Sequence, residues 1–328
     1  MLEHGGRLRA AAQRYGIELR DWLDLSTGIA PWPWPLPAIP SSLWQRLPED
    51  DDGLEQAARD YYQCDSLLPL SGSQAAIQAL PRLRAAGRIG VLAPCYAEHA
   101  AAWQRHGHEV IELADEQVDG LIDQLDVLLL VNPNNPTGRR LDAERLLDWH
   151  ARLRARGGWL VVDEAFMDCT PQHSLLPRAG GEPGLIVLRS LGKFFGLAGA
   201  RLGFAFAEAV LLDQLAELLG PWTVSGPTRW VARAALADVG TQQTRRGELG
   251  EAGVRLAGLL RGHGLAAQGT ALFQWLAYPQ AAELHEHLAR RGILVRLFDT
   301  PPSLRFGLPP DEAGWARLDQ ALGEWRPA

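Results

Sequence analysis

The sequence is poor in cysteine: its three cysteines, Cys64, Cys95 and Cys169, are odd in number and widely spaced. This pattern fits neither a disulfide framework nor the paired spacing of a zinc site. We therefore expect a reducing, cytoplasmic environment and no bound metal. His285 and His287 do not change this expectation, because residues two apart lie on different sides of a helix.

The sequence also lacks an excess of positive charge and any long apolar run. Its formal net charge is -7 and its pI is near 5.7, with no cluster of Lys and Arg. Since a nucleic-acid surface needs such a cluster, we expect a small soluble molecule as the partner. No apolar run approaches the length of a membrane span, and residues 1–16 contain no apolar signal core. We therefore expect neither membrane insertion nor secretion.

What is present is enough apolar sequence for more than one hydrophobic core, with 47% hydrophobic residues in a chain of 328. Strand candidates alternate with helix candidates in the first two thirds of the chain, which indicates a mostly parallel sheet covered by helices. These strands are expected at residues 67–70, 89–93, 110–113, 127–131, 159–163, 185–188 and 203–207. Helices at 222–237 and 243–263 and strands at 272–278 and near 294 and 304 then predict a smaller α/β domain.

The turn between the last two strands of the larger domain carries a candidate catalytic residue, Lys193, within the glycine-rich segment LRSLGKFFGLAGARLGF. A lysine in an apolar pocket becomes an amine nucleophile, which a Schiff base with a carbonyl cofactor requires. Ser190 and Arg201 flank it with a hydroxyl and a forked cation, which suit a phosphate. The alternative for Lys193 alone is an ordinary surface charge.

A second candidate segment follows the expected strand 67–70. Strand, glycine-containing turn and helix start form an arrangement that directs backbone N–H groups at an anion. We interpret Gly72, Ser73 and Gln74 as phosphate ligands. The alternative is a plain serine cap at the start of the helix.

Polar residues also follow three other expected strands, and the carboxyl ends of parallel strands meet at one edge of a sheet. Tyr96 follows one strand, the segment NPNNPTG at 132–138 follows another, and Asp163 ends a third. An aspartate at the end of an apolar strand needs a partner, and a pyridinium nitrogen would serve. The alternatives are a structural ion pair for Asp163 and a core position for Tyr96.

NPNNPTG, DEAF, and SLGK with Arg201 eight residues later resemble, in this order and spacing, the fold-type I aminotransferases that use pyridoxal 5'-phosphate. The resemblance implies an aspartate-aminotransferase-like α/β fold, with domains at 41–220 and 221–328. It also implies that Lys193 binds the cofactor covalently, that Asp163 pairs with its ring nitrogen, and that Asn135 bonds its phenolic oxygen. By the same resemblance Tyr96 stacks on the ring, and the phosphate is held by Ser73, Gln74, Ser190 and Arg201.

Within this family, the HGG segment at 4–6, DLSTGIAP and DEAF are most similar to the threonine-phosphate decarboxylases of cobalamin biosynthesis, a group akin to the histidinol-phosphate aminotransferases. This likeness implies a homodimer and an N-terminal arm, residues 1–40, over the active site. It implies that the substrate, a phosphorylated amino acid, is bound by His4, Gly28, Asn135, Arg296 and Arg305. The alternative for both arginines is an ordinary position at a strand edge.

Some positions differ from the family pattern. Phe166 stands where many relatives have a tyrosine, Leu47 replaces a tyrosine offered to the neighbouring subunit, and Ala30 and Ser71 stand where asparagines are common. The expected reaction is decarboxylation of L-threonine O-3-phosphate to (R)-1-aminopropan-2-ol O-phosphate. A histidinol-phosphate-type aminotransferase is the alternative enzyme, and a non-catalytic protein derived from the fold is the other alternative. The orientation of the substrate selects between the two reactions, and the sequence does not show it.

Overall fold

The structure is a computed structural model that describes residues 4–326, and it contains two compact units. The large unit comprises Trp34–Asn135 and Arg139–Thr244. The small unit comprises the N-terminal part up to Pro33, the short segment Pro136–Gly138, and the C-terminal part from Arg245. The division expected from the sequence had its boundaries at residues 40 and 220, whereas residues 34–40 and 221–244 group here with the large unit.

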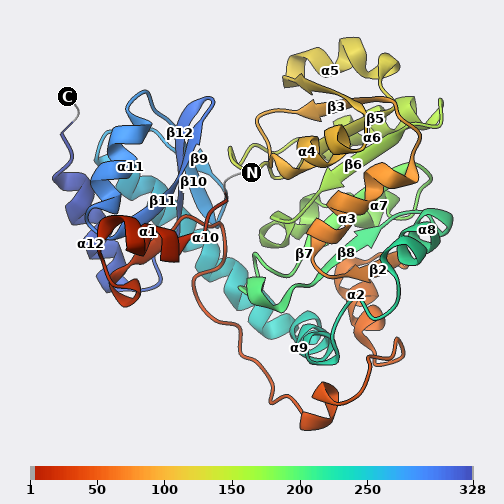
Figure 1. Ribbon diagram of the computed structural model, residues 1–328, viewed down its shortest axis with the longest axis horizontal. Helices are drawn as coiled ribbons and strands as arrows, with labels where there is room; N and C mark the ends of the chain where they lie inside the picture. Colours follow the sequence, from red (N-terminus) through yellow and green to blue (C-terminus); the bar gives the residue numbers. More distant parts are fainter. Residues whose placement is uncertain (1–3, 327–328) are drawn as a thin grey trace. The chain divides into compact units, whose positions relative to one another are not determined.

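A seven-stranded sheet in the order β2-β8-β7-β6-β5-β3-β4 forms the large unit (Figure 1). Neighbouring strands are parallel, except that β8 runs antiparallel to both β2 and β7. The strands are β2 (Leu67–Leu70), β3 (Arg88–Leu92), β4 (Glu109–Leu113), β5 (Val127–Val131), β6 (Trp159–Asp163), β7 (Leu185–Ser190) and β8 (Gly203–Phe206).

Helices cover both faces of this sheet, which explains why its central strands are apolar along their whole length. Val161 of β6 packs in one cluster with Trp103 of a helix on one face. On the other face, Phe204 of β8 lies 5.5 Å from Tyr62 of another helix, measured between ring centroids. The helices are α2 (Leu54–Tyr62), α3 (Ser73–Ala79), α4 (Glu98–Arg105), α5 (Asp115–Leu121), α6 (Ala143–Arg154), α7 (Leu176–Ala179), α8 (Ala209–Leu219) and α9 (Gly226–Ala237).

Helix α9 begins four residues later than expected, because its start is set by a cap. Ser225 accepts a hydrogen bond from the backbone of Thr228, and Pro227 occupies the first turn, where its missing N–H is not needed. Helix α10 (Val239–Gly262) follows, and the boundary between the two units falls within it. Short 3-10 turns occupy Leu19–Asp21, Ser41–Trp44, Leu80–Leu83, Ile122–Gln124, Met167–Cys169, Pro171–His173 and Ala198–Ala200.

The small unit contains a five-stranded sheet in the order β1-β11-β12-β10-β9 (Figure 1). Strand β1 comes from the N-terminal part of the chain and pairs in parallel with β11, while the other pairs are antiparallel. The strands are β1 (Leu23–Leu25), β9 (Gln268–Gly269), β10 (Phe273–Ala277), β11 (Ile293–Asp299) and β12 (Pro302–Gly307). The helices are α1 (Leu8–Tyr15), α11 (Ala281–Ala289) and α12 (Glu312–Gly323). The predicted α/β fold, a mostly parallel helix-covered sheet with a second α/β unit, is confirmed.

No helix among residues 4–326 combines the length and the apolar character needed to cross a bilayer.

Candidate active site

The polar residues that follow β3, β5 and β6 converge at the carboxyl edge of the large sheet. The backbone N–H of Asn132, just past β5, donates to the carbonyl oxygen of Asp163 at the end of β6 (2.9 Å). The Asn134 side chain donates to the carbonyl oxygen of Pro94, just past β3 (2.9 Å). The parallel strand order therefore brings together segments that are far apart in the sequence.

Asp163 is buried, with 4% of its surface exposed, and both of its carboxylate oxygens have donors. His99 of α4 donates from Nε2 to Oδ2 (2.9 Å), and the backbone N–H of Ala165 donates to Oδ1 (3.0 Å). These bonds orient the carboxylate. His99 was not among the residues predicted from the sequence. Its position three residues after Tyr96, on an expected helix, was the one available signal.

Tyr96 is fixed beside this pair. Its ring meets the edge of the His99 ring at 6.0 Å between centroids, and its hydroxyl donates to Gln74 Oε1 (3.2 Å). Gln74 in turn donates from Nε2 to Glu98 (3.2 Å), so its side chain is engaged within the protein. Burial, followed by the nearby carboxylates of Glu98 and Asp163, raises the pKa of Tyr96 to about 12. Tyr96 therefore remains a neutral phenol, which is suited to stacking on an aromatic ring.

A cradle for an anion is formed where β2 ends. Gly72 has φ +76°, and a Cβ atom there would lie 2.9 Å from Nη2 of Arg201, so only glycine lets the guanidinium approach this closely. Likewise, a Cβ atom at Gly203 would lie 2.5 Å from the backbone nitrogen of Ser73. Ser190, buried at the end of β7, contributes a hydroxyl group. A guanidinium, a hydroxyl and backbone N–H groups are the donors that a phosphate requires.

Lys193 lies in the turn after β7 and is half-buried. Its Nζ is 5.6 Å from the ring centroid of Phe166, a buried residue on the loop after β6. The next two residues, Phe194 and Phe195, are fully buried and pack on Trp34. The amine is therefore presented by a rigid apolar wall. Lys193 is also the only lysine in the sequence, so this site has the chain's single ε-amine.

The loop that presents Asn135 is held by two buried asparagines that were not assigned individual roles from the sequence. Asn132 bonds Leu141 twice, donating from Nδ2 to its carbonyl oxygen (3.2 Å) and accepting from its N–H at Oδ1 (2.9 Å). The backbone of Asn134 donates to the carbonyl oxygen of Arg139 (2.7 Å). These bonds close the loop at its base. Asn135 itself is half-buried.

The small unit brings together the segments predicted to bind the substrate. Arg296 on β11 and Arg305 on β12 are direct partners in the antiparallel register. Arg305 is 7% exposed and donates from Nη2 to the carbonyl oxygen of Ser26 (2.9 Å). Burial, reinforced by the positive charge of Arg296, lowers the pKa of Arg305 to about 10. Two neighbouring guanidinium groups suit a ligand with two anionic groups.

The N-terminal HGG segment reaches the same place. The backbone N–H of Gly6 donates to Ser26 Oγ (2.7 Å), and a Cβ atom at Gly5 would lie only 2.3 Å from the Ser26 carbonyl oxygen. His4, at the end of this contact, is exposed, and Gly28 is buried two residues after Ser26. Four of the five residues predicted for the substrate, His4, Gly28, Arg296 and Arg305, thus lie on segments of the small unit near Ser26, whereas Asn135 belongs to the large unit.

The residues of the large unit fit pyridoxal 5'-phosphate. At Gly72 and Gly203, a Cβ atom would collide with the Arg201 guanidinium and the Ser73 backbone nitrogen, which are donors that suit a phosphate. The Asp163 carboxylate, buried and fixed by His99, is a group that suits a protonated ring nitrogen. Tyr96 offers an aromatic face, and Lys193 supplies an amine for the cofactor's carbonyl carbon.

Comparisons with known proteins agree with this chemistry. Residues 47–318 match the family model "Aminotransferase class I and II". The chain is 65% identical over 323 residues to a threonine-phosphate decarboxylase of Pseudomonas aeruginosa, covering 98% of this chain and 97% of the relative. It is 47% identical to a threonine-phosphate decarboxylase of a Sinorhizobium species, covering 97% of each. The crystal structure of histidinol-phosphate aminotransferase from Sinorhizobium meliloti in complex with pyridoxal-5'-phosphate superimposes with a TM-score of 0.85, at 20% identity, over 98% of this chain and 95% of that one.

Proposed function

Because this chain belongs to the family of class I and II aminotransferases, we propose that it is a pyridoxal-phosphate-dependent decarboxylase of L-threonine O-3-phosphate. The products are carbon dioxide and (R)-1-aminopropan-2-ol O-phosphate, which we assign to cobalamin biosynthesis from the sequence resemblance. The observation that carries the proposal is the 65% identity, over nearly the full length of both chains, to a threonine-phosphate decarboxylase.

The residues of the large unit have separate tasks in this reaction. When bound, the cofactor accepts the electron pair that remains at the substrate's α carbon after a bond there breaks. Lys193 holds the cofactor and moves a proton to or from the reacting carbon. Asp163, oriented by His99, would pair with the cofactor's ring nitrogen. Ser190, Arg201 and the backbone after Gly72 bind the phosphate.

Orientation of the substrate would then decide which bond breaks, because the bound cofactor would weaken only the bond that is aligned with it. Arg305 and Arg296 are the proposed partners of the substrate's carboxylate and phosphate, together with His4, Gly28 and Asn135. If these residues align the substrate's bond to its carboxylate with the cofactor, carbon dioxide would be lost, whereas alignment of the bond to hydrogen would give transamination.

The reaction is tested by incubating the purified protein and pyridoxal phosphate with L-threonine O-3-phosphate. We expect carbon dioxide and 1-aminopropan-2-ol phosphate in equal amounts. The alternative reaction is tested in parallel with histidinol phosphate and 2-oxoglutarate. Glutamate formed there, without carbon dioxide in the first assay, would contradict the proposed reaction and leave the cofactor site intact.

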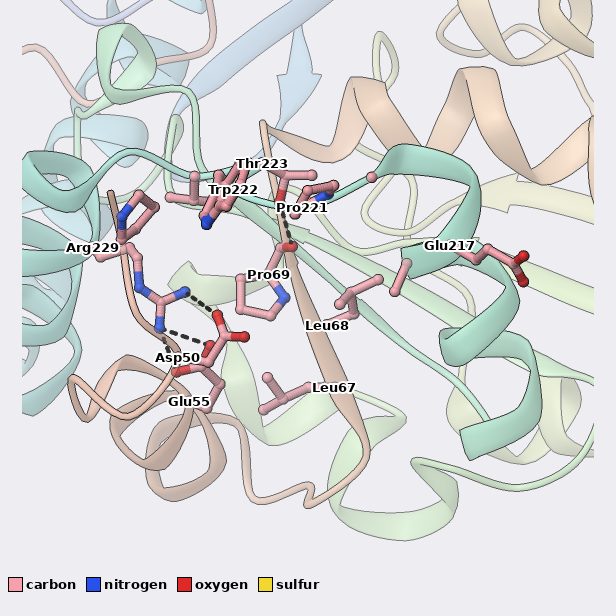
Figure 2. Close-up of a pocket in the computed structure, with 14 residues that line it drawn as sticks. Asp50, Glu55, Leu67, Leu68, Pro69, Glu217, Pro221, Trp222, Thr223 and Arg229 are labelled. Atoms are coloured by element: carbon pink, nitrogen blue, oxygen red, sulfur yellow. Dashed lines mark hydrogen bonds and ion pairs between the residues drawn. The ribbon is translucent and has the colours of Figure 1, made fainter. Parts of the chain in front are cut away.

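We further propose a homodimer, in which a hollow of the large unit with a volume of about 540 Å³ meets a second copy. Figure 2 shows Trp222 and Pro221 at its upper wall, opposite the Asp50 and Glu55 side chains that bond Arg229. Trp222 is 60% exposed, and Leu47, which directly precedes the wall residue Pro48, is 63% exposed. Large apolar side chains that are this exposed to solvent support the proposal that another protein chain covers them.

The dimer is tested by light scattering after size exclusion. The wild-type chain is expected at twice its 35.9 kDa mass. Trp222→Ser combined with Leu47→Ser is expected to shift it toward the monomer. Val254→Ser, at an apolar position in α10 that is 74% exposed, is expected to have no effect. We also propose a cytoplasmic location, supported by the low, odd number and wide spacing of the three cysteines in the sequence. Cell fractionation tests this location.

A further inference from the structure

A single buried guanidinium joins both ends of the loop that carries Phe166. Arg189 on β7 is 1% exposed and donates from Nη1 to Glu164 Oε2 (2.8 Å) and from Nη2 to Asp168 Oδ1. Glu164 directly follows Asp163, and both carboxylates bound to Arg189 are completely buried. Phe166 lies midway between them. Its backbone is therefore fixed on both sides by one side chain.

Further bonds complete this clamp. Glu164 also accepts from the hydroxyl of Ser174 (2.6 Å), and Asp168 also accepts from the hydroxyl of Tyr61 (3.2 Å). Burial raises the pKa of Glu164, and the positive charge of Arg189 opposes this shift. Buried ion pairs of this kind often stabilise a fold no better than apolar residues of the same volume. A role in positioning explains better why charged residues occupy this place.

Arg189 is turned away from the cofactor residues of its own sheet. Side chains alternate between the two faces of a strand, and Asp163 is the register partner of Leu188. Asp163 and Ser190 therefore share one face, whereas Arg189 and Glu164 lie on the other. An effect of Arg189 on the cofactor must pass through the loop that it holds.

We propose that Arg189 is a positioning residue for the Lys193 amine: by clamping Glu164 and Asp168, it holds the Phe166 ring against Lys193. The contact is the 5.6 Å separation between Nζ and the ring centroid. The proposal rests on the proposed function only through the binding of the cofactor at Lys193. Its test uses no substrate, so it can fail while the assigned reaction stands.

The face of an aromatic ring attracts a positive charge. Phe166 therefore favours the protonated state of the lysine nitrogen that carries the cofactor, and the visible absorption of the bound cofactor reports this state. We expect Phe166→Leu to lower the pH midpoint of that absorption change by roughly 0.5 to 1 pH unit. The substitution leaves the other titratable residues on the surrounding elements in place, namely Asp163, His99, Tyr96 and Arg201.

Arg189→Lys and Arg189→Met are expected to lower the midpoint in the same direction. The direction of this shift is informative. Loss of the positive charge of Arg189 would by itself raise the pH midpoint of a nearby cationic group, so a lowered midpoint must have another cause. Lysine keeps the charge but loses the forked geometry that reaches both carboxylates. A fall with Arg189→Lys therefore indicates lost positioning, and it keeps the test usable if Arg189→Met fails to fold.

The decisive measurement is a double-mutant cycle in the holoenzyme. If Arg189 acts through Phe166, Arg189→Lys in the Phe166→Leu background produces no further shift. Leu153→Ala is the matched control, because it removes a buried side chain from α6, which contacts the start of β6 rather than the loop after it. It is expected to lower the thermal midpoint and leave the pH midpoint unchanged. An unshifted or raised pH midpoint in Arg189→Lys, additive shifts in the cycle, or an equal shift in Leu153→Ala would each overturn the proposal.

Discussion

His99 and Asp163 form a buried pair on neighbouring elements of the large unit, with Nε2 donating to Oδ2 across 2.9 Å. His99 is 1% exposed and Asp163 is 4% exposed, so water does not compete for this bond. The second carboxylate oxygen accepts from the N–H of Ala165. The His99 ring in turn meets the Tyr96 ring, with 6.0 Å between the ring centroids, so the pair lies beside Tyr96.

His99→Leu removes the side-chain donor to Asp163. A hydrogen bond to a buried charged group contributes about 1.5–3 kcal/mol, so we expect the cofactor to bind roughly 10 to 100 times more weakly. The dissociation constant is measured by equilibrium dialysis with absorbance detection. His99→Gln, which keeps a nitrogen donor, is expected to recover most of the affinity. Equal affinities in wild type and His99→Leu would show that the pair does not orient Asp163 for the cofactor.

Lys193→Ala is expected to remove the visible absorption band of the bound cofactor and all turnover. Because Lys193 is the chain's only lysine, borohydride reduction of the wild-type holoenzyme should attach one cofactor to one peptide. Mass spectrometry of the digest checks this, and the variant provides the blank. Turnover in Lys193→Ala would refute the assigned role.

The candidate site residues could be located from the sequence where a local motif marks them. Lys193 and Asp163 end or follow apolar strands within short motifs, and the alternation of strands and helices indicates the edge where they meet. His99 has no comparable local mark. Its role comes from a contact with a residue 64 positions away, which only the packed sheet creates.

The same limit applies to the fold. Strand β1 is only three residues long, and it pairs with β11, where Leu23 lies opposite Ile293. Because these residues are far apart in the chain, no local sequence pattern predicts the pairing. Helix α8 was not predicted, although its buried Leu211, Leu212 and Leu215 lie opposite the exposed Asp213, Gln214 and Glu217. The start of α9 depended on the Ser225 cap rather than on the apolar pattern.

Gly5→Ala tests the contact between the N-terminal segment and Ser26. The added Cβ atom would lie 2.3 Å from a backbone oxygen, so the segment must shift, at a cost of about 1–3 kcal/mol. We expect KM for the phosphorylated substrate to rise roughly 5- to 100-fold, with unchanged cofactor affinity. Gly262→Ala, where the added atom meets nothing within 4 Å, is the control. An unchanged KM would separate the HGG segment from substrate binding.

Arg305→Met should raise stability while removing substrate binding. The pKa of Arg305 is lowered from 12.5 to about 10, chiefly by burial, so the folded chain disfavours its charged form. Between pH 10 and 12.5 the unfolded chain keeps the Arg305 proton while the folded chain has lost it, so the free energy of unfolding rises with pH in this range. Below pH 10 both states are protonated, and the full cost of burying the charge lowers the stability of the folded chain. At pH 8 we expect the thermal midpoint of the substrate-free variant to rise by about 3 to 10 °C. Arg255→Met, at an exposed pair with Glu312, should change neither property. A lower midpoint with an unchanged KM would identify Arg305 as structural, whereas a higher midpoint with lost binding would show that its charge is kept for the substrate.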